Sequence, residues 1–335
     1  MNNQFKSVID MIDKRYSFVF FDVGAMGGIP RKWLPLENNM EVVGFEPDSR
    51  AYSSLITHKS IKYFNYALND TSHDLTYYIT KSSGKSSIFK PNKDILSLYE
   101  DDERFNIVRE EVIPACKVQG LDRIMEENSI ETVDFIKLDT QGSELHILKG
   151  GQKRLIPYTF GVQIEVEFIE MYKQQPLFRH IDEFFDSYGF VLMDLRRQYW
   201  KRKDFYRYRG KGQLIFGDAL YFKKTDIFCN DISIRKDLAY AKAKILKGVL
   251  ICFIYKTFDY AGALVKAALE HGIFTHDEYE KVIAITKKYA QKGIPLGMHL
   301  GKIYSMLNLI LQKFKPPSYL GWADGDAGIS NVKDI

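Results

Sequence analysis

Residues Phe20–Gly28 read FFDVGAMGG, a short apolar run that stops at a cluster of glycines. A buried strand that enters a glycine turn is the place where an α/β sheet lets a cofactor approach bare backbone. A second apolar run, Glu41–Phe45, is followed by the acid Glu46, and an acid at this point commonly binds ribose hydroxyls. The pattern predicts a nucleotide-type cofactor, although glycine turns also occur for purely structural reasons.

The spacing of the glycines distinguishes between two kinds of cofactor. A dinucleotide fingerprint needs the spacing G-x-G-x-x-G. Counted from Gly24, that spacing would require glycine at positions 26 and 29, where the chain has Met26 and Ile29. The turn therefore argues against NAD and favours the more permissive turn of S-adenosylmethionine enzymes.

Composition and length indicate an ordinary globular protein. The chain has 335 residues, 45% of them apolar and 27% charged, enough for one large domain and an addition. Its three cysteines form no C-x-x-C pair, which suggests a reduced, cytoplasmic setting. The N-terminal stretch is polar, and the longest apolar run, Gly248–Tyr255, falls short of the roughly 20 residues that span a bilayer. We expect a cytoplasmic protein without a membrane span.

Strand-like and helical patterns alternate along the first two thirds of the chain, which predicts an α/β fold with a largely parallel, doubly wound sheet. Helical patterns lie between several of the strand-like runs, for example Ser143–Lys149 and Leu177–Tyr188. The strand-like runs are Phe18–Val23, Glu41–Phe45, Ile61–Ala67, Val133–Asp139, Phe160–Phe168, Phe190–Leu195 and Ala219–Lys223.

The pattern changes near residue 226, so we divide the chain into residues 1–225 and a helical extension, 226–335. Gly272 is typical of a helix end, and Thr275 with Glu278 three residues later is typical of a capping box. The last residues are rich in turn formers and are expected to be loosely ordered. Apolar residues at helical spacing are expected to bury against the first domain or a second subunit, which would allow a homo-oligomer. They are Ile245, Val249, Phe253 and Leu264.

The segment Asp134–Gly151, DFIKLDTQGSELHILKGG, carries the most specific pattern. It resembles the signature of FkbM-type S-adenosylmethionine-dependent methyltransferases. Other blocks of that family have similar counterparts in the same order, over about residues 15–224: DVGAMGGIPRKW, GFEPD, Ala67-Leu68 followed by Ser86-Ser87, QIEVEFIEMY and GDALYF.

The resemblance implies a class I methyltransferase fold, with seven strands of which six are parallel and the last antiparallel. It also implies O-methylation of a sugar or natural-product hydroxyl, as in bacterial carbohydrate modification. By position, Glu46 would bind the ribose of S-adenosylmethionine, and other residues of the same motifs would contact the rest of the cofactor. These are Asp22, Gly24, Ala25 and Gly27 near the methionine, Pro47 and Asp48 beside Glu46, Ala67 and Leu68 by the adenine, and Asp139. Gln141 stands where many members have glutamate, which weakens any expectation of a metal there.

Methyl transfer to a hydroxyl needs a group that removes the proton, near the carboxyl edge of the sheet. Asp139 ends the fourth predicted strand, and Glu165 and Glu167 lie on one face of the fifth. We expect Asp139 or Glu165 to be the base and Glu167 to meet the substrate. Lys137 shares a face with Asp139 and could pair with Glu165. The alternative is that Lys137–Glu165 is a buried structural pair and Glu167 a solvated strand end.

Residues 196–211, RRQYWKRKDFYRYRGK, carry a net charge of +7, whereas the whole chain carries +4. Their basic and aromatic side chains, including Trp200, Arg202 and Lys203, are expected to bind an anionic sugar or metabolite at the rim of the site. A solvated hairpin loop is the plain alternative. Nucleic acid is the second choice of ligand, because the remainder of the chain is slightly acidic. A non-catalytic protein that binds glycan or nucleic acid on this fold is the rival function.

Overall fold

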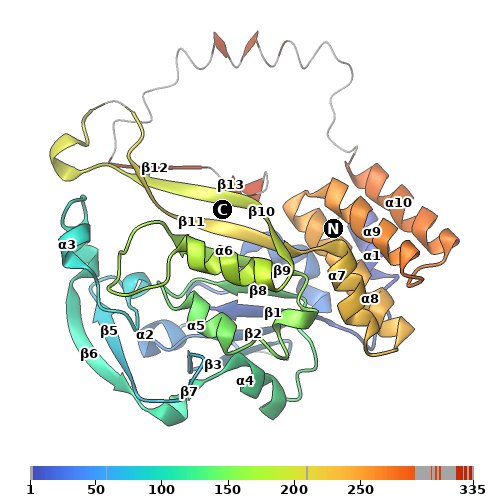
Figure 1. Ribbon diagram of the computed structural model, residues 1–335, viewed down its shortest axis with the longest axis horizontal. Helices are drawn as coiled ribbons and strands as arrows, with labels where there is room; N and C mark the ends of the chain where they lie inside the picture. The colour runs from blue at the N-terminus through green and yellow to red at the C-terminus, as the bar shows by residue number, and fades with distance from the viewer. Residues whose placement is uncertain are drawn as a thin grey trace.

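The computed structural model describes residues 3–57, 59–208, 210–290, 303, 306–307, 309–310, 322–326, 328–329 and 332–333. Its centre is a sheet in the order β12-β10-β11-β9-β8-β1-β2-β3 (Figure 1). In that order the strands are Ala323–Gly325, Phe190–Trp200, Gln213–Lys223, Gly161–Glu167, Phe135–Leu138, Phe18–Val23, Met40–Phe45 and Ile61–Phe64.

The strand directions are those of a class I methyltransferase sheet. β1 pairs in parallel with β2 and β8, β2 with β3, and β8 with β9, while β11 runs antiparallel to both β9 and β10. Six strands therefore point one way and β11, the last of the seven in the chain, points the other. The one difference from the expected seven strands is β12, which adds an eighth strand to the edge at β10.

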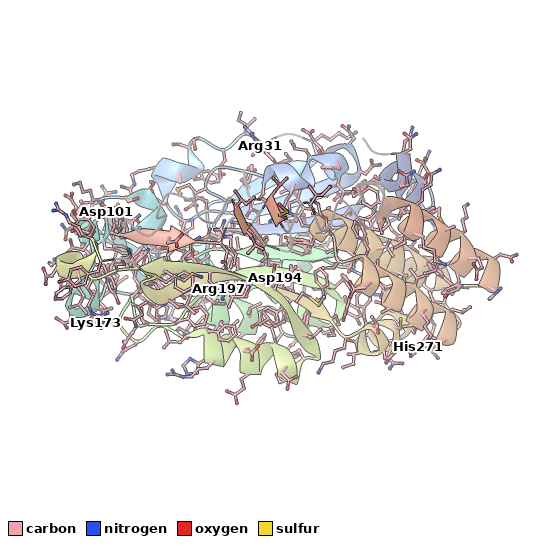
Figure 2. All side chains as sticks on the ribbon, turned by 90° about the horizontal axis from the view of Figure 1, so that it is seen from above. Arg31, Asp101, Lys173, Asp194, Arg197 and His271 are labelled. Atoms are coloured by element: carbon pink, nitrogen blue, oxygen red, sulfur yellow. The ribbon has the colours of Figure 1, made fainter. Side chains whose placement is uncertain are left out.

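Helices cover both faces of the sheet. Residues of β1 alternate between the two sides, since Phe18 and Phe20 join one apolar core and Phe21 and Val23 join the other. One face carries α4, α5 and α6, which are Leu121–Glu127, Glu144–Lys149 and Phe178–Ser187. The other face carries α1, η1, α7, α8, α9 and α10, which are Asn3–Ile9, Arg31–Asn39, Thr225–Ser233, Leu238–Tyr255, Phe258–Glu270 and His276–Ala290. Figure 2 shows Arg31 of η1 on one side of β10, the strand that carries Asp194 and Arg197.

The helical extension shares the core of the sheet instead of forming a unit of its own. The link after β1 supplies only the 3₁₀ helix η1 to this side, and the link after β2 forms only the four-residue α2, Ser49–Tyr52. Helix α8 fills the uncovered face, and Ile245, Val249 and Phe253 are buried there with residues of β1, β8 and β11. The chain's own sheet thus takes up the apolar stripe, one of the two partners that the sequence allowed. Gly272, with φ +67°, follows α9, and the backbone nitrogens of Thr275 and Glu278 bond to each other's side chains, which confirms the capping box.

A buried ion-pair cluster ties α8 to the strands. Both carboxylate oxygens of Asp134, just before β8, are used: Oδ1 accepts from Lys244 Nζ at 2.6 Å and Oδ2 from Lys247 Nζ at 3.0 Å. The backbone N–H of Val19 on β1 also donates to Oδ2, at 2.8 Å. All three charged side chains are at most 2% exposed. Burial opposes the charge of Asp134, but the two lysines hold the pKa of its carboxyl below the ordinary value.

The sequence analysis missed an insertion between β3 and β8. The predicted strand Ile61–Ala67 breaks after Phe64, and Ala67 begins the short β4, Ala67–Leu68, which pairs with β7, Val118–Gln119. Between them lies an antiparallel hairpin of β5, Leu75–Thr80, and β6, Ile107–Ile113. β6 reads IVREEVI and is mostly exposed, so it lacks the apolar face that would have marked it as a strand. Short helices complete the insertion: η2 Ser83–Lys85, α3 Lys93–Leu96, η3 Asp102–Phe105 and η4 Ala115–Lys117.

The loop within the basic segment 196–211 is shorter than predicted, because β10 continues to Trp200 and β11 begins at Gln213. Charged residues sit within these strands because they pair across them, as Arg196 does with Asp218 at 2.7 Å. Of the expected loosely ordered tail, the described residues form β12 and the small ladder of β13, Gly328–Ile329, with β14, Val332–Lys333. The rest of that prediction lies outside the described residues.

Candidate functional site

The carboxyl ends of β1, β2 and β8 meet at one edge of the sheet. The N–H of Gly24 donates to Phe45 O at 3.0 Å, and the N–H of Asp139 donates to Val23 O at 3.0 Å. Gly24 has φ +76°, and a Cβ there would lie 1.9 Å from the carbonyl oxygen of Asp139. Only glycine fits this position, so the first glycine of the turn is needed to let two strand ends approach each other.

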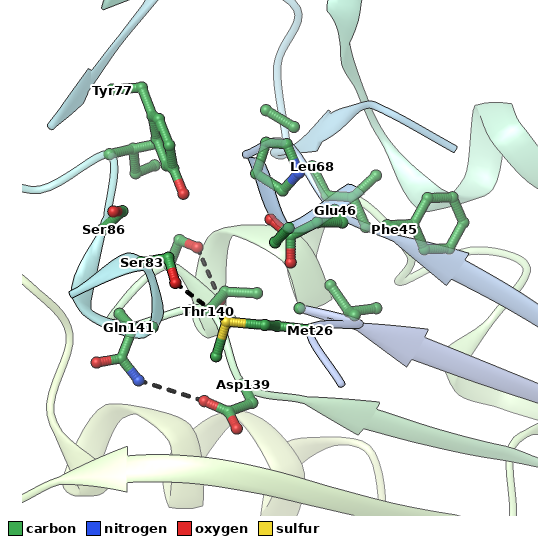
Figure 3. Close-up of a pocket in the computed structure, with 18 of the residues that line it drawn as sticks. Met26, Phe45, Glu46, Leu68, Tyr77, Ser83, Ser86, Asp139, Thr140 and Gln141 are labelled. Atoms are coloured by element: carbon green, nitrogen blue, oxygen red, sulfur yellow. Dashed lines mark hydrogen bonds between the residues drawn. The ribbon is translucent and has the colours of Figure 1, made fainter. Parts of the chain in front are cut away.

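A cavity of about 380 Å³ opens at this edge (Figure 3), within the range of ligand sites. One wall is apolar and comes from Phe45, Leu68 and Ile147, with Ala67 beside them. The opposite wall comes from the insertion, through Tyr77 and residues 82–86. The floor is formed by residues 139–141 and Glu165.

Glu46 is the acid that faces the cavity. It is 5% exposed, and its Oε1 accepts a hydrogen bond from the backbone N–H of Asp48 at 2.9 Å. In Figure 3 its carboxyl group points into the space between Tyr77 and Met26. Burial, opposed by that hydrogen bond, raises the pKa of Glu46 to about 7.

The structure brings six of the predicted cofactor residues together around the cavity: Gly24, Glu46, Pro47, Ala67, Leu68 and Asp139. Four others are not part of this lining: Asp22, Ala25 and Asp48 are buried, and Gly27 is exposed on the turn. Asp48 caps α2 by accepting from Arg50 N and pairs with the Arg50 guanidinium. Asp22 is 1% exposed, and burial raises the pKa of its carboxyl to about 6.

Sequence reasoning missed the wall that the insertion supplies. Ser86 was noted from the sequence, but Tyr77 and Lys85 were not. Tyr77 lies on β5, whose alternating pattern LTYYIT is a strand signal that was not used. Met26 also lines the cavity, and Ser83 Oγ donates to its sulfur at 3.5 Å. Tyr77 and Lys85 lie outside the motifs read from the sequence, whereas Met26 belongs to the glycine turn but was not expected to line the cavity.

The two candidate bases have different surroundings. Lys137 Nζ lies 3.5 Å from Asp139 and 3.7 Å from Asp22, its register neighbour on β1. Burial opposes the charge of Asp139, but Lys137 and Lys85 lower the pKa of its carboxyl. Burial and then the charge of Asp139 raise the pKa of Glu165 well above its ordinary value. The suggested Lys137–Glu165 pair is replaced by Lys137 with two aspartates.

The predicted substrate residues lie away from this lining. Glu167 is 3% exposed, so it is no solvated strand end, and burial raises the pKa of its carboxyl well above the ordinary value. Trp200 is 4% exposed, in an apolar cluster with Tyr99, Phe105 and Trp322. It is a packing residue at the end of β10 and has no open face toward the cavity.

Arg202 and Lys203 lie beyond β10, on the hairpin loop. Arg202 Nη2 donates to Gln213 Oε1 at 3.3 Å, and its guanidinium lies 5.8 Å from the ring centre of Tyr99. The backbone N–H of Lys203 donates to Leu98 O at 3.0 Å. Arg202 lines a separate hollow of about 260 Å³ at this loop, and neither Arg202 nor Lys203 lines the main cavity.

Three further features bear on the class of protein. All three cysteines are free thiols, with Cys229 and Cys252 buried and Cys116 exposed. Over the described part of the chain, no three His, Cys, Asp or Glu side chains are grouped to hold a metal ion. None of the described helices has the length and apolar character needed to cross a membrane.

Comparison with known proteins adds a family match. The profile of the Methyltransferase FkbM domain matches residues 22–192, just over half of the chain, and this segment contains every residue that lines the cavity. The 2-O-methyltransferase NoeI of Sinorhizobium fredii is 22% identical over 191 residues, covering 56% of this chain and 78% of that protein.

Two solved structures are also similar in part. The precorrin-6y C5,15-methyltransferase of Geobacter metallireducens has 13% identity and a TM-score of 0.28, covering 66% of this chain and 86% of that one. M. capricolum TrmK in complex with S-adenosyl-homocysteine has 9% identity and a TM-score of 0.26, covering 87% and 97%.

Proposed function

Because this chain belongs to the FkbM methyltransferase family, we propose that it transfers the methyl group of S-adenosylmethionine to a hydroxyl of a sugar or similar small metabolite. The observation that carries the proposal is the cavity at the carboxyl edge, with Glu46 on one side and Asp139 on its floor. In an open α/β sheet this edge is where ligands bind.

The lining fits the proposed cofactor. The Glu46 carboxyl has one oxygen bonded to Asp48 N, and it offers acceptors to a vicinal diol such as the ribose hydroxyls. Leu68 and Ile147 give apolar contact suited to a purine, and the bare backbone at Gly24 suits the amino-acid end. When bound, S-adenosylmethionine supplies an electrophilic methyl group on a positively charged sulfur.

The chain's own task is then to orient the acceptor and remove its proton. S-adenosylmethionine, held by Glu46, the backbone at Gly24 and the apolar wall, would supply the methyl group to the acceptor oxygen, and its sulfur would keep the electron pair of the bond given up. The hydroxyl proton moves to the Asp139 carboxylate, which the charge of Lys137 keeps ionised. Glu165 fits the role of base less well, because burial raises the pKa of its carboxyl and so favours the uncharged form.

The choice of a sugar hydroxyl is supported by the similarity to a 2-O-methyltransferase and by the polar floor of the cavity. Transfer of tritiated methyl from S-adenosylmethionine to a panel of acceptors would test it. The panel contains neutral hexosides and deoxyhexosides, uronic acids, nucleotide sugars and unmodified RNA. Labelled sugar would support the proposal, whereas label only in RNA would replace it.

Replacing Glu46 by Gln is expected to weaken binding of S-adenosylhomocysteine by about 1.5–3 kcal/mol, because the charged hydrogen-bond acceptor is lost. The pKa of Glu46 is about 7 in the free protein, and its ionised form is the better acceptor. Wild-type affinity should therefore rise between pH 6 and pH 8, while the affinity of the variant stays flat. Calorimetry at both pH values measures this, and equal affinities of the two proteins would contradict it.

We also propose that an anionic acceptor that extends beyond the main cavity contacts the hairpin loop, where Arg202 lines a hollow of its own. Changing Arg202 and Lys203 together to Ala should raise the KM for an acidic acceptor such as a uronic acid, with unchanged affinity for S-adenosylhomocysteine. The effect should shrink with added salt, because exposed charges are screened over about 8–10 Å.

The matched control changes Lys287 and Lys288, at the end of α10, to Ala. A gel-shift titration of RNA at two salt concentrations tests the rival ligand. Tight RNA binding with a steep salt slope, flattened only by the Arg202 and Lys203 changes, would favour nucleic acid as the acceptor.

A further inference from the structure

The side-chain amide of Gln141 lies between the two carboxyls of the cavity floor. Its Nε2 is 3.2 Å from Asp139 Oδ1, a contact drawn in Figure 3, and 2.5 Å from Glu165 Oε1. Its Oε1 accepts from Lys85 Nζ and from the Tyr172 hydroxyl, each at 3.0 Å. An amide has two N–H donors and two lone pairs, so every hydrogen-bonding position of this side chain is used.

The backbone of Gln141 is fixed as well. Its φ is +59°, a left-handed conformation that costs a residue with a Cβ about 1–2 kcal/mol. The following Gly142 has φ +103°, and the carbonyl oxygen of Gln141 accepts from Ser87 Oγ at 2.8 Å. Gln141 is 6% exposed. A buried residue held in an uncommon conformation by contacts at both ends has its amide oriented before any ligand arrives.

The two carboxyls that share this amide have different surroundings. Asp139 has an ammonium group at 3.5 Å and a side chain that is 38% exposed, so its charge is both paired and hydrated. Glu165 is 9% exposed, and no ion pair reaches it from the described residues. The pKa shifts agree with these surroundings, because the pKa of Asp139 is lowered and that of Glu165 is raised.

We infer that Gln141 is a positioning residue that separates the duties of the two carboxyls, holding Asp139 as the charged proton acceptor and Glu165 as an uncharged hydrogen-bonding partner. This inference rests on the proposed methyl transfer. With one N–H directed to each carboxyl, Gln141 prevents the two groups from sharing a proton directly. Glutamate at this position would have no N–H for either carboxyl and would add a third acid between them.

Lys85 acts on the same amide from the insertion. Its ammonium lies 5.9 Å and 5.6 Å from the ring centres of Phe105 and Phe216, and it donates to Gln141 Oε1. A cation on the carbonyl end of an amide polarises the N–H groups at its other end. Lys85, between β5 and β6, thereby influences Asp139 through the Gln141 amide.

Titration of carbon-13-labelled side-chain carboxyls by NMR tests the inference in the full-length protein, with no acceptor present. The variants are Gln141→Glu, Gln141→Met and Lys85→Met. In the wild type, Asp139 should titrate below its ordinary range while Glu165 stays protonated at pH 7. In the variants the Asp139 midpoint should rise by about one pH unit, since its charged form loses a hydrogen bond or a nearby cation. Unchanged Asp139 midpoints in all three variants would overturn the inference.

A second measurement separates this outcome from failure of the proposed function. Calorimetry with S-adenosylhomocysteine reports whether the wild type binds the cofactor product at all. A wild type that binds none refutes the methyltransferase proposal, and the inference about Gln141 falls with it. A wild type that binds, together with variants of lowered melting temperature and unshifted Asp139, refutes Gln141 alone. If the Gln141 variants do not fold, Lys85→Met on the partly exposed side of the amide decides the question.

Discussion

Asp139→Asn is expected to lower the turnover of methyl transfer by roughly 10²–10⁴, the contribution of a positioned proton acceptor. The substitution keeps the shape of the side chain and its contact with Gln141, and it removes only the negative charge. Binding of S-adenosylhomocysteine should persist, because Glu46 and the apolar wall are untouched. The measurement is single-turnover transfer to the acceptor that the panel identifies, with calorimetry on the same protein.

Glu165→Gln is the matched control for that experiment. Burial raises the pKa of Glu165 and so favours its uncharged form, which glutamine resembles, and the glutamine can still accept from Gln141. Turnover should stay close to the wild-type value. Loss of activity in Glu165→Gln with normal activity in Asp139→Asn would exchange the two assignments.

Ionisation of the base should not change the kcat of the wild type across the neutral pH range. The pKa of Asp139 lies below its ordinary value of about 4, so the ionised form persists until the solution is more acidic than that. The acid limb of the pH profile, seen in kcat, should therefore lie below pH 4.

Asp134→Ala is expected to destabilise the protein by about 3–5 kcal/mol, because it leaves two buried lysines without their counter-charge. Lys244 and Lys247 are at most 2% exposed and both donate to this carboxylate. Urea denaturation measures the free energy of unfolding, and hydrogen exchange should show early opening of α8. A decrease in the free energy of unfolding as small as that for a surface pair would contradict the conclusion that this cluster holds α8 against the strands.

The control for this change is Glu131→Ala, which removes a surface pair nearby. Glu131 pairs with Arg235 at 3.0 Å, but its side chain is 79% exposed, so the expected cost is about 0–1 kcal/mol. The pH dependence has a definite sign. The folded pKa of Asp134 is depressed, so its contribution is present above the unfolded value of about 4 and is lost as pH falls. The wild type and Asp134→Ala should therefore approach each other in stability in acid.

Several parts of the fold could be predicted because they depend on local pattern. β1 was predicted with its observed bounds, since Phe18–Val23 is an apolar run closed by a glycine turn. The start of α5 at Glu144 and the capping box at Thr275 depend on residues three or four positions apart. The face of the cavity around Gly24 and Glu46 followed from motifs in which each residue lies next to a strand end.

The insertion and the hairpin could not be predicted in the same way. β6 is a strand because its backbone pairs with β5, and its charged side chains are tolerated in water. β10 extends through Arg196 and Arg197 because Asp218 and Asp326, distant in sequence, supply partners. Trp200 looked like part of a binding loop until Tyr99 and Phe105 enclosed it.

The sequence by itself determined the family, the parallel sheet and the edge at which the cofactor motifs end, because these follow from short-range pattern and motif order. Tertiary structure alone decided the partner of α8, the partner of Lys137 and the difference between Asp139 and Glu165. The physical reason is that burial and charge pairing depend on neighbours from other strands. Two acids that look alike in the chain acquire opposite pKa shifts once Lys137 lies beside one and the other is buried next to the charge of Asp139.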